Sequence, residues 1–538
     1  MATLIKSILF LVLLGTLFGT EAQSNTVTAT SCNSSDVQSA INSSSGGDTV
    51  IIPAGKCTWT SSVTIAGKGI HIQGAGSGRI IAYDNGIEVL TIGTGNKIVA
   101  IAGFSPGFSS ASITSGQVLR ISQNNNRGNW MQGTVTSIVG NLLTMNITST
   151  NGAVSTHRWL VSTVPQTIIV DNSSSGIFSI TEDTTNHTSL SGIKIAQGTV
   201  AAGYIGMNYA PGGQAILIHD NWFEQSSAGG ELINSNTNRG VIWNNSFDGS
   251  NNGSTNLDFT AAVRIKIPNP QTGQNAWTAA SFWGMSDTGG VNNLYVETND
   301  FHAFQAVTDN DDNGRMVFRY NLVDHAEFAT HGADTSPYGQ RYFEYYNNVG
   351  NFNGYGDGTT FNMANSWIGL VRGGTFIAHD NTLPPIVSMD FTKGDILMTV
   401  FNLQEGSNNP SNACWGAGTT AGADYHAPRQ VGFGRVTGTG LDGKKRSADE
   451  TTYVGDSEPI YIWNNNRTFT VGITDFGGTQ CSNPDFSRNY IVLNRDYSLG
   501  TAKPGYTPYT YPHPLAQGST STGNSVASPT NLTVVAIQ

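Results

Sequence analysis

Acidic and amide side chains are concentrated in one short stretch, which runs from Asp309 to Gly314 and reads Asp-Asn-Asp-Asp-Asn-Gly. The spacing Asp-x-Asp-x-Asn-Gly places oxygen ligands at alternate positions, as in short loops that wrap calcium. An EF-hand needs a Glu further along the chain, but Tyr320 occupies that place. The sequence therefore predicts either a calcium site, with Asp309, Asp311 and Asn313 as ligands, or an acidic turn without metal.

Titratable side chains continue after this stretch and could transfer protons or hold an anionic substrate. His331 and Asp334 share the next loop, and Arg315 and Arg341 stand at the starts of two strand-like runs. A guanidinium can fork onto a carboxylate, and His and Asp are common proton-transfer groups. We predict these four residues as the catalytic set.

A recurring sequence pattern determines where these residues lie in the fold. Between Ala215 and Asn466 a run rich in Val, Ile, Phe and Tyr repeatedly ends at an Asn, and these anchors are Asn221, Asn245, Asn299, Asn321, Asn347, Asn381 and Asn465. A unit of about 22–26 residues, lengthened in places by inserted loops, is typical of a solenoid. Its composition favours strands. We expect an all-β, right-handed parallel β-helix whose Asn side chains form a ladder along the turns.

The alternation of side chains sets the phase of each strand. The third and fifth residues before each anchor are mostly apolar and are assigned to the interior. They are Ile216, Ile218, Gly240, Ile242, Leu294, Val296, Met316, Phe318, Tyr342, Glu344, Phe376, Ala378, Ile460 and Ile462. Glu344 is the exception in this set, and a buried carboxylate must be paired or have a raised pKa.

The residues between the interior positions then point outward and form a strip of rings and guanidinium groups. Rings stack on sugar faces, so we predict this strip as the substrate-binding surface. Its predicted binding residues are Arg239, Trp243, Tyr295, Arg319, Tyr345 and His379. The alternative is that inserted loops cover the strip and its rings are ordinary core.

The strand register also predicts which arginines lie next to each other on adjacent coils. Arg239, Arg315 and Arg341 each stand at the sixth position before an anchor. Arg315 and Arg341 should therefore share one column on adjacent coils, about 4.8 Å apart by backbone spacing. Such a pair needs carboxylates or an anionic ligand between its members. The column is either a structural ion-pair network or a site for an anionic sugar.

Composition places the chain outside the cell. Only 12% of the residues are charged, 64 of 538 are Gly, and the net charge is −11. That charge argues against a nucleic-acid partner. Lys6 followed by the apolar run Ile8 to Phe18 indicates a signal peptide over residues 1–22. No later apolar run is long enough to span a membrane. We expect a secreted monomer with disulfides Cys32–Cys57 and Cys414–Cys481, one near each end of the solenoid.

The beginning of the mature chain carries a resemblance. A helix is expected from Ser34 to Ser45, with Val37, Ala40 and Ile41 on its apolar face, to cap the open end of the solenoid. Ile52-Pro-Ala-Gly and the later Gly74-Ala-Gly follow it. This opening resembles that of pectin-lyase-like β-helix proteins, which implies the fold and little about chemistry.

The sequence pattern divides the chain after the signal peptide into four segments. We predict the cap and first coils over 23–106, a small all-β insert over 107–165, the main β-helix over 166–515 and a flexible tail over 516–538. The insert is loosely similar to β modules of phage tail and bacterial surface proteins, which implies binding or spacing.

Two later stretches extend the resemblance to a group of secreted bacterial proteins described as pectate-lyase-like. They are 308–348 and the ending from Arg495 through Lys503-Pro-Gly-Tyr to Pro514. In pectate lyases acidic residues hold calcium and an Arg acts as base, and both residue types occur here. Polygalacturonases carry Asn-Thr-Asp, Asp-Asp, Gly-His-Gly and Arg-Ile-Lys in that order. Here Arg264-Ile-Lys lies upstream and Asn-Thr-Asp is absent.

We therefore predict a carbohydrate-active protein whose partner is a polysaccharide. A lyase on uronate-containing polysaccharide is the leading interpretation, with calcium as its cofactor if the acidic stretch binds metal. A non-catalytic glycan-binding or tail-spike-like surface protein and a hydrolase of the polygalacturonase type remain alternatives.

Overall fold

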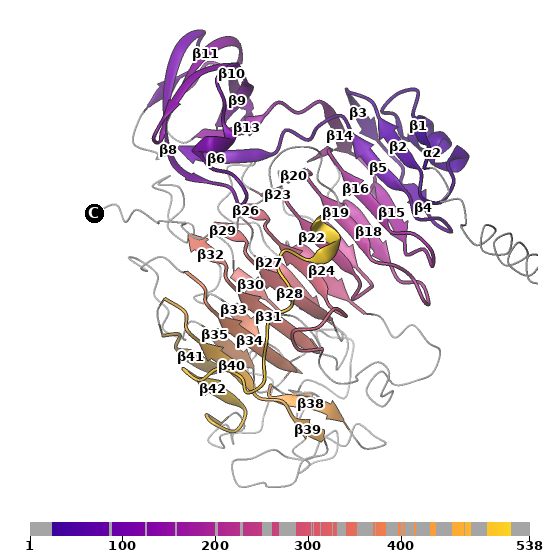
Figure 1. Ribbon diagram of the computed structural model, residues 1–538, viewed down its shortest axis with the longest axis vertical. Helices are drawn as coiled ribbons and strands as arrows, with labels where there is room; N and C mark the ends of the chain where they lie inside the picture. The colour runs from indigo at the N-terminus through magenta and orange to yellow at the C-terminus, as the bar shows by residue number, and fades with distance from the viewer. Residues whose placement is uncertain are drawn as a thin grey trace, which may run out of the picture.

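The chain folds mainly into β-strands in a computed structural model (Figure 1). The model describes residues 24–517, apart from 85–88, 124–125, 157–158, 200–202, 226–229, 250–260, 268–286, 303, 305, 312–313, 325–326, 331–339, 352–368, 372, 383–395, 400–401, 404–413, 416–430, 437–454, 467 and 475–491. The statements below concern the described residues.

Three parallel sheets make up the main body. Sheet A contains β1 (Thr26–Thr28), β2 (Thr49–Ile52), β5 (His71–Gly74), β16 (Thr188–Ser191), β19 (Ile216–His219), β22 (Gly240–Trp243), β25 (Leu294–Glu297), β28 (Arg315–Arg319), β31 (Tyr342–Tyr346), β34 (Thr375–His379), β40 (Ile460–Trp463) and β42 (Tyr497–Leu499). Sheet B contains β3 (Gly55–Trp59), β14 (Thr167–Asp171), β17 (Lys194–Gln197), β20 (Trp222–Glu224), β23 (Ser246–Asp248), β26 (Asp300–His302), β29 (Leu322–Asp324) and β32 (Val349–Asn351). Sheet C contains β4 (Val63–Ile65), β15 (Phe178–Thr181), β18 (Ile205–Asn208), β21 (Ile233–Ser235), β24 (Ala261–Lys266), β27 (Ala306–Asp311), β30 (Glu327–Ala329), β33 (Gly369–Val371), β35 (Ile396–Thr399) and β41 (Val471–Thr474).

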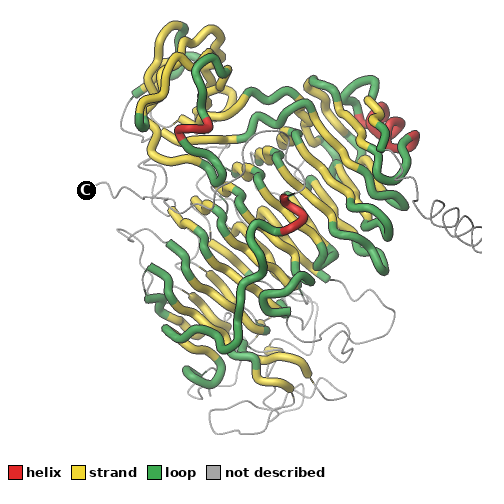
Figure 2. The backbone as a smooth tube through the Cα atoms, in the orientation of Figure 1, coloured by secondary structure: helices red, strands yellow, loops and turns green. Residues whose placement is uncertain are grey.

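The chain visits the sheets in a fixed order. From β19 it enters sheet B at β20, sheet C at β21 and sheet A again at β22, and each strand pairs in parallel with its equivalent one turn later. The strands therefore lie in successive layers across the body (Figure 2). This topology is consistent with the predicted parallel β-helix.

The core runs through the middle of these layers. Ile218, Ile242, Val296 and Phe318 occupy successive strands of sheet A in direct register and belong to one buried cluster. Phe223, Phe247 and Phe301 of sheet B stack nearly parallel, with ring centroids 4.8 and 4.6 Å apart. The nine apolar residues predicted as buried columns are all buried, so that prediction is confirmed: Ile216, Ile218, Ile242, Leu294, Val296, Met316, Phe318, Ile460 and Ile462.

An Asn ladder marks each turn from sheet A to sheet B. The backbone N–H and the Nδ2 of each Asn donate to the Oδ1 of the next, over 2.9–3.2 Å. The residue before each ladder Asn has a positive φ, between φ 49 and φ 58. This left-handed conformation turns the chain sharply. The ladder consists of Asn221, Asn245, Asn299, Asn321, Asn348, Asn381 and Asn465.

One predicted anchor is wrong by a residue. Asn347 has a positive φ and takes the turning position, while Asn348 enters the ladder. The strand before it is therefore shifted by one. Phe343 and Tyr345 point into the core, and the two residues predicted there, Tyr342 and Glu344, point outward. The sequence Asn-Asn offers either residue as the anchor, and the turn geometry selects the second.

The predicted N-terminal capping helix is present and ends at Ser43, two residues before the predicted end at Ser45. Helix α2 (Ser34–Ser43) buries Val37, Ala40 and Ile41 against the first coil. Its N-cap residue is Asn33, so the helix starts at the first of the serines that follow.

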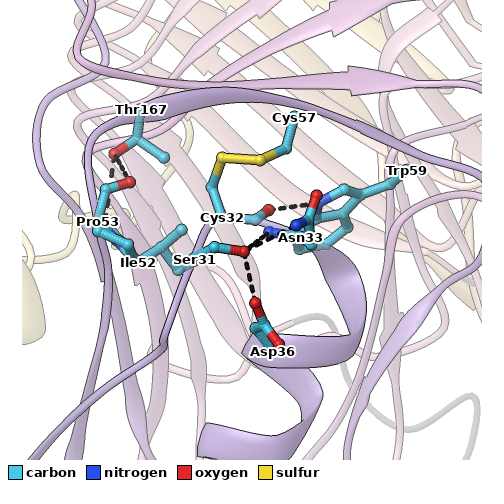
Figure 3. Close-up of a disulfide and its surroundings, with 9 residues drawn as sticks. All are labelled: Ser31, Cys32, Asn33, Asp36, Ile52, Pro53, Cys57, Trp59 and Thr167. Atoms are coloured by element: carbon cyan, nitrogen blue, oxygen red, sulfur yellow. Dashed lines mark hydrogen bonds between the residues drawn. A yellow bond between two sulfur atoms is a disulfide. The ribbon is translucent and has the colours of Figure 1, made fainter.

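The predicted disulfide Cys32–Cys57 ties the start of this helix to β3 (Figure 3). The indole Nε1 of Trp59 donates to the carbonyl oxygen of Cys32 over 2.8 Å, so the bridge and the core share this corner. The second predicted pair includes Cys481, which lies outside the described residues.

A closed barrel interrupts the winding between β5 and β14. Its strands, in order around the barrel, are β10 (Asn126–Val139), β11 (Leu142–Asn151), β8 (Gly95–Phe104), β6 (Ile80–Asp84), β13 (Trp159–Thr163) and β9 (Val118–Gln123). It has a buried cluster of its own, including Leu119, Met131 and Leu143. The barrel begins at β6, well before the boundary predicted at residue 107. Its first two strands, β6 and β8, lie in the segment that was predicted to form the first coils.

The barrel rests on the outer face of sheet B. Arg127 pairs with Asp248 across the contact, with Nε to Oδ2 at 2.6 Å. Tyr83 of β6 bonds to Asp300 and to the Nε2 of His302, the latter over 2.6 Å. These side chains are all buried, and beside them Ile80 and Leu160 of the barrel pack with Trp222 and Leu322 of sheet B, so the contact combines polar bonds with apolar packing and is closed to solvent.

Short elements complete the described structure. They are β7 (Leu90–Thr91) with β12 (Ser155–Thr156), β36 (Asn402–Leu403) with β37 (Cys414–Trp415), β38 (Phe433–Val436) with β39 (Gly455–Ser457), the 3-10 turn η1 (Ser110–Ser112) and α3 (Pro514–Gln517). The predicted signal peptide, residues 1–22, and the tail beyond 517 lie outside the described residues. No helix in the described part is both long enough and apolar enough to cross a membrane.

Candidate functional site

The outer face of sheet A carries four of the six predicted binding residues, and three of them share one column. Its members follow one another in strand register: His219, Trp243, Glu297, Arg319, Tyr346, His379 and Trp463. The rings stack where they are adjacent, with centroids 4.2 Å apart for His219–Trp243 and 4.4 Å apart for His379–Trp463. The predicted strip therefore exists for Trp243, Tyr295, Arg319 and His379.

A distant segment covers this column. Residues 503–517, here called the C-terminal strap, run across the outer face of sheet A and end in α3 beside β22 (Figure 1). Tyr509 and Leu515 pack on the outer apolar cluster that includes Trp243 and Tyr295. Trp243, Tyr295, Arg319 and His379 are each less than 5% exposed, so in this structure they offer no surface to a polysaccharide.

Polar contacts hold the strap to the sheet. Arg319 pairs with Glu297 at 2.6 Å and donates to the carbonyl oxygens of Tyr509 and Thr510 over 2.6 and 2.8 Å. The backbone N–H of His513 donates to Glu297 over 2.8 Å. Burial lowers the pKa of Arg319, but Glu297 and the phenol of Tyr346 outweigh it and hold that pKa above its ordinary value. The arginine therefore stays charged and acts as an anchor.

Glu344 is a second anchor. Its carboxylate accepts the hydroxyl of Tyr506 from the strap over 2.5 Å, the hydroxyl of Tyr342, and the backbone N–H of Gly289 over 2.9 Å. Burial raises the pKa of Glu344, and these hydrogen bonds oppose the rise. The prediction that Glu344 faces the interior is wrong, since it lies between Val317 and Ile377 on the outer face. It is buried because the strap covers it.

The predicted placement of Tyr345 is also wrong. Its ring stacks on Phe318 inside the coil, with centroids 5.5 Å apart. The one-residue shift at Asn348 causes this change. It also moves Arg341 out of the column predicted for Arg315, whose strand partner is Tyr342. Tyr345 is a core residue.

Arg341 has a structural partner. Its Nη1 and Nη2 donate to the two carboxylate oxygens of Glu458 over 2.9 and 2.8 Å, and the side chain is fully buried. Arg315 remains partly exposed. Burial, and next the charge of Arg341, lower the pKa of Arg315 to about 10. The predicted proximity of the two arginines is therefore present, without the shared column.

Sheet C presents a different surface. Arg264 and Lys266 lie on the outer face of β24, directly beside Asp309 and Asp311 of β27. The Nη2 of Arg264 donates to Asp311 and its Nη1 to Glu231, each over 2.9 Å, and its Nε lies 3.4 Å from Asp309. The side chains of Arg264 and Lys266 keep 23% and 30% of their surface exposed. We call these five residues the sheet C cluster.

Electrostatics favour a fixed cation at the centre of this cluster. Burial lowers the pKa of Arg264, but the carboxylates of Asp309, Glu231 and Asp311 outweigh it and raise the pKa above its ordinary value. Lys266 lies 3.5 Å from Asp311 and is the more exposed of the two cations. The cluster therefore offers a partly exposed ammonium and a held guanidinium beside three carboxylates.

The predicted metal ligands fall partly in this cluster. Asp309 and Asp311 are next to each other on its surface, but Arg264 and Lys266 compensate their charge. Among the described residues no group of three His, Cys, Asp or Glu side chains could hold a metal ion, and Asn313 lies outside them. The described carboxylates do not fit a calcium site by themselves, and calcium remains a prediction.

Arg239 is a predicted binding residue that reaches solvent. Its side chain is 31% exposed, pairs with Glu182 at 3.1 Å and lies over the exposed ring of Tyr209 at 5.1 Å. His331 and Asp334 lie outside the described residues. The role of Arg264 and Lys266 was not predicted, although the spacings Arg-x-Lys and Asp-x-Asp in two strand-like runs could have paired them.

Comparisons with known proteins give no family. No family model matches the chain, and no curated protein matches it significantly. Solved structures with which the chain shares similarity include an alginate lyase from Paenibacillus sp. (13% identity, 67% of this chain and 96% of that one, TM-score 0.24), a tailspike protein of Pseudomonas phage LKA1 (13%, 69% and 66%, TM-score 0.19) and a tailspike protein of Acinetobacter baumannii bacteriophage Fri1, a capsular polysaccharide depolymerase (12%, 67% and 58%, TM-score 0.20). These TM-scores are too low to transfer an activity.

Proposed function

We propose that the protein is a secreted, right-handed parallel β-helix that cleaves a uronate-containing polysaccharide on the outer face of sheet C. The main support for this proposal is the sheet C cluster, in which two partly exposed cations on one strand lie next to paired carboxylates on the adjacent coil. The face that the sequence pattern favours is covered by the strap, so it cannot receive a chain of sugars without undocking.

Uronate recognition follows from the charges. Lys266 and Arg264 can meet the sugar carboxylate, and Asp309, Asp311 and Glu231 hold the guanidinium in a fixed orientation. Neutralising that carboxylate acidifies the hydrogen on the neighbouring sugar carbon. A base then removes this proton, a carbon–carbon double bond forms, and the glycosidic oxygen leaves with the rest of the chain.

Arg315 supports this reaction as the candidate base. It begins β28 of sheet A, directly after the turn that follows β27 of sheet C, so it lies at the corner where the chain passes from sheet C to sheet A. Its pKa of about 10 makes the neutral form easier to reach than for an ordinary arginine. His331 and Asp334 follow β30, the next strand of sheet C along the body, and remain our candidates for returning a proton to the leaving oxygen.

One observation favours a second function, glycan binding without cleavage. Arg264 already interacts with three carboxylates, as a purely structural ion network would. In that case the surface would bind acidic sugars through Lys266 and Arg239 without turnover. A hydrolase would instead use Asp309 and Asp311 as its carboxylate pair.

The test is to incubate the full chain with polygalacturonate and with alginate, and to follow ultraviolet absorbance and reducing ends together. A lyase raises both signals, a hydrolase raises only reducing ends, and a binding protein raises neither. Arg264→Ala should abolish the signal, whereas Arg495→Ala, which removes an ion-paired arginine from the last coil, should not. Absorbance that is unaffected by Arg264→Ala would refute the site.

A further inference from the structure

The barrel differs from the rest of the chain in charge. Residues 79–165 carry the cations Arg79, Lys97, Arg120, Arg127 and Arg158 against two carboxylates, Asp84 and Glu88, whereas the whole chain has a net charge of −11. Arg79 and Arg127 are buried, and Arg127 is used in the contact with sheet B, so Arg120 and Lys97 are the described cations of the module that reach its surface. A basic module on an acidic protein indicates an anionic partner for the module itself.

One wall of the barrel gathers side chains suited to a sugar chain. Arg120 of β9 lies opposite Gln132 of β10, and its Nε and Nη2 donate to the Oε1 of Gln132 over 3.2 and 2.8 Å. The same guanidinium lies 4.2 Å from the ring centroid of Trp130, the next outward residue on β10. All three side chains are partly exposed. The arginine therefore fixes both an amide and an indole ring at the surface.

The neighbouring strand extends this wall with uncharged polar groups. Ser149 and Asn151 of β11 pair with Gln132 and Trp130 in register, and both are exposed. The Nδ2 of Asn151 donates to the carbonyl oxygen of Gly128 over 2.6 Å, which orients its amide. The barrel contacts sheet B through Tyr83 and Arg127, and the wall itself reaches solvent.

We propose that this wall, formed by Arg120, Trp130, Gln132, Ser149 and Asn151, is a binding site for an acidic polysaccharide, separate from the sheet C cluster. The indole stacks on a sugar ring, the guanidinium meets a carboxylate, and the amides and hydroxyl bond to sugar hydroxyls. The wall has one cation among uncharged amides and hydroxyls. Nucleic acids are held through several phosphate contacts, so a polysaccharide fits this surface better.

The site does not depend on cleavage at sheet C. A barrel that holds the polymer would keep the protein on its substrate and raise the local concentration of sugar at a second site. It would act equally in a protein that binds without turnover. The proposal therefore survives a failure of the proposed reaction.

Affinity electrophoresis of the full chain tests it, in native gels that contain alginate, polygalacturonate or neutral dextran. Retardation is expected in the two acidic gels and not in dextran. Trp130→Ala and Arg120→Gln should each weaken binding at least tenfold while melting temperatures stay near that of the parent. The matched control is Ile98→Ala, which removes an exposed apolar side chain from β8 on the same barrel, and it should bind normally.

Several outcomes would overturn the proposal. Normal retardation of folded Trp130→Ala and Arg120→Gln proteins would remove the wall from binding, and equal retardation in dextran would remove the role of charge. If Trp130→Ala does not fold, Trp130→Phe and Arg120→Gln decide. Binding of duplex DNA as tight as that of the acidic polymers would assign the wall to another partner. Arg264→Ala should keep the barrel's binding, which separates a failure here from a failure at sheet C.

Discussion

Sheets A and C each carry an arginine paired with carboxylates on the outer face, but only one of the two faces is exposed. Sheet A carries stacked rings and the pair Arg319–Glu297, and the C-terminal strap buries them. Sheet C carries Arg264 and Lys266 beside Asp309 and Asp311, and both cations keep exposed surface. Outward-pointing arginines and rings therefore do not by themselves identify a binding face. What distinguishes the two faces is the strap, whose contact with Arg319 joins groups far apart in the chain.

The largest effect is expected from breaking the covered ion pair. Glu297→Ala leaves the Arg319 guanidinium buried without its carboxylate, which should lower the free energy of unfolding by about 3–5 kcal/mol. Urea denaturation followed by tryptophan fluorescence measures this. Glu231→Ala, which removes one carboxylate from the partly exposed Arg264, should cost less than about 1 kcal/mol. Equal losses in the two variants would contradict the contrast between the faces.

Substitutions on sheet C should lower activity more than substitutions on sheet A, which is the reverse of their order in stability. Arg264→Ala is expected to lower kcat/KM on a uronate polymer by about a hundredfold, because it removes the fixed cation next to the sugar carboxylate. His379→Ala on the covered face should leave kcat/KM within about twofold, since no substrate reaches that ring. Initial rates at low substrate measure both. A larger loss for His379→Ala than for Arg264→Ala would exchange the roles of the two faces.

The strap should also respond to acid. Burial, followed by the charge of Arg319, lowers the pKa of His513 to about 4, while the ordinary value is 6.5. The folded state therefore favours neutral His513, whose Nδ1 accepts the N–H of Leu515. This contribution is complete above pH 6.5 and is lost as the pH falls towards 4, by about 3 kcal/mol.

His513→Gln should flatten this part of the stability curve, and limited proteolysis of the strap between pH 7 and pH 4 measures it. Cleavage that rises equally with acid in parent and variant would assign the release to another group, such as Glu297.

The sequence predicts the body of the fold well because repetition constrains it. The apolar columns from Ile216 to Ile462 and six of the seven Asn anchors follow from a phase that every coil shares. The remaining anchor is wrong because Asn347 and Asn348 satisfy the pattern equally, and only the positive φ of Asn347 separates them. The same ambiguity explains why Tyr345 is predicted on the surface but lies in the core.

The candidate site is less predictable for a physical reason. Burial of the sheet A strip depends on contacts of Tyr506, Tyr509 and His513 with strands far back in the chain, and such pairings leave no periodic signal. The pairing of Arg264 with Asp309 depends on which strands of sheet C become neighbours one coil apart. The roles of His331 and Asp334 remain predictions.

The smallest expected effect of a substitution is on calcium affinity. Arg264 and Lys266 compensate Asp309 and Asp311, so the parent should bind calcium weakly. Arg264→Ala removes the larger share of that compensation and should bind calcium more tightly, by a few fold. Calorimetric titration compares the two proteins, with Lys68→Ala, a change on the N-terminal coil, as control. Tighter binding by the parent than by Arg264→Ala would instead support the calcium loop predicted from the sequence.

Acidic sugars should reach sheet C and not sheet A, and a crystal structure of the full chain with a bound uronate oligosaccharide tests this most directly. We predict a sugar carboxylate within hydrogen-bond distance of Lys266 or Arg264, with the strap still seated on Arg319 and Glu344. A sugar chain lying on Trp243 and His379 with the strap displaced would contradict the assignment.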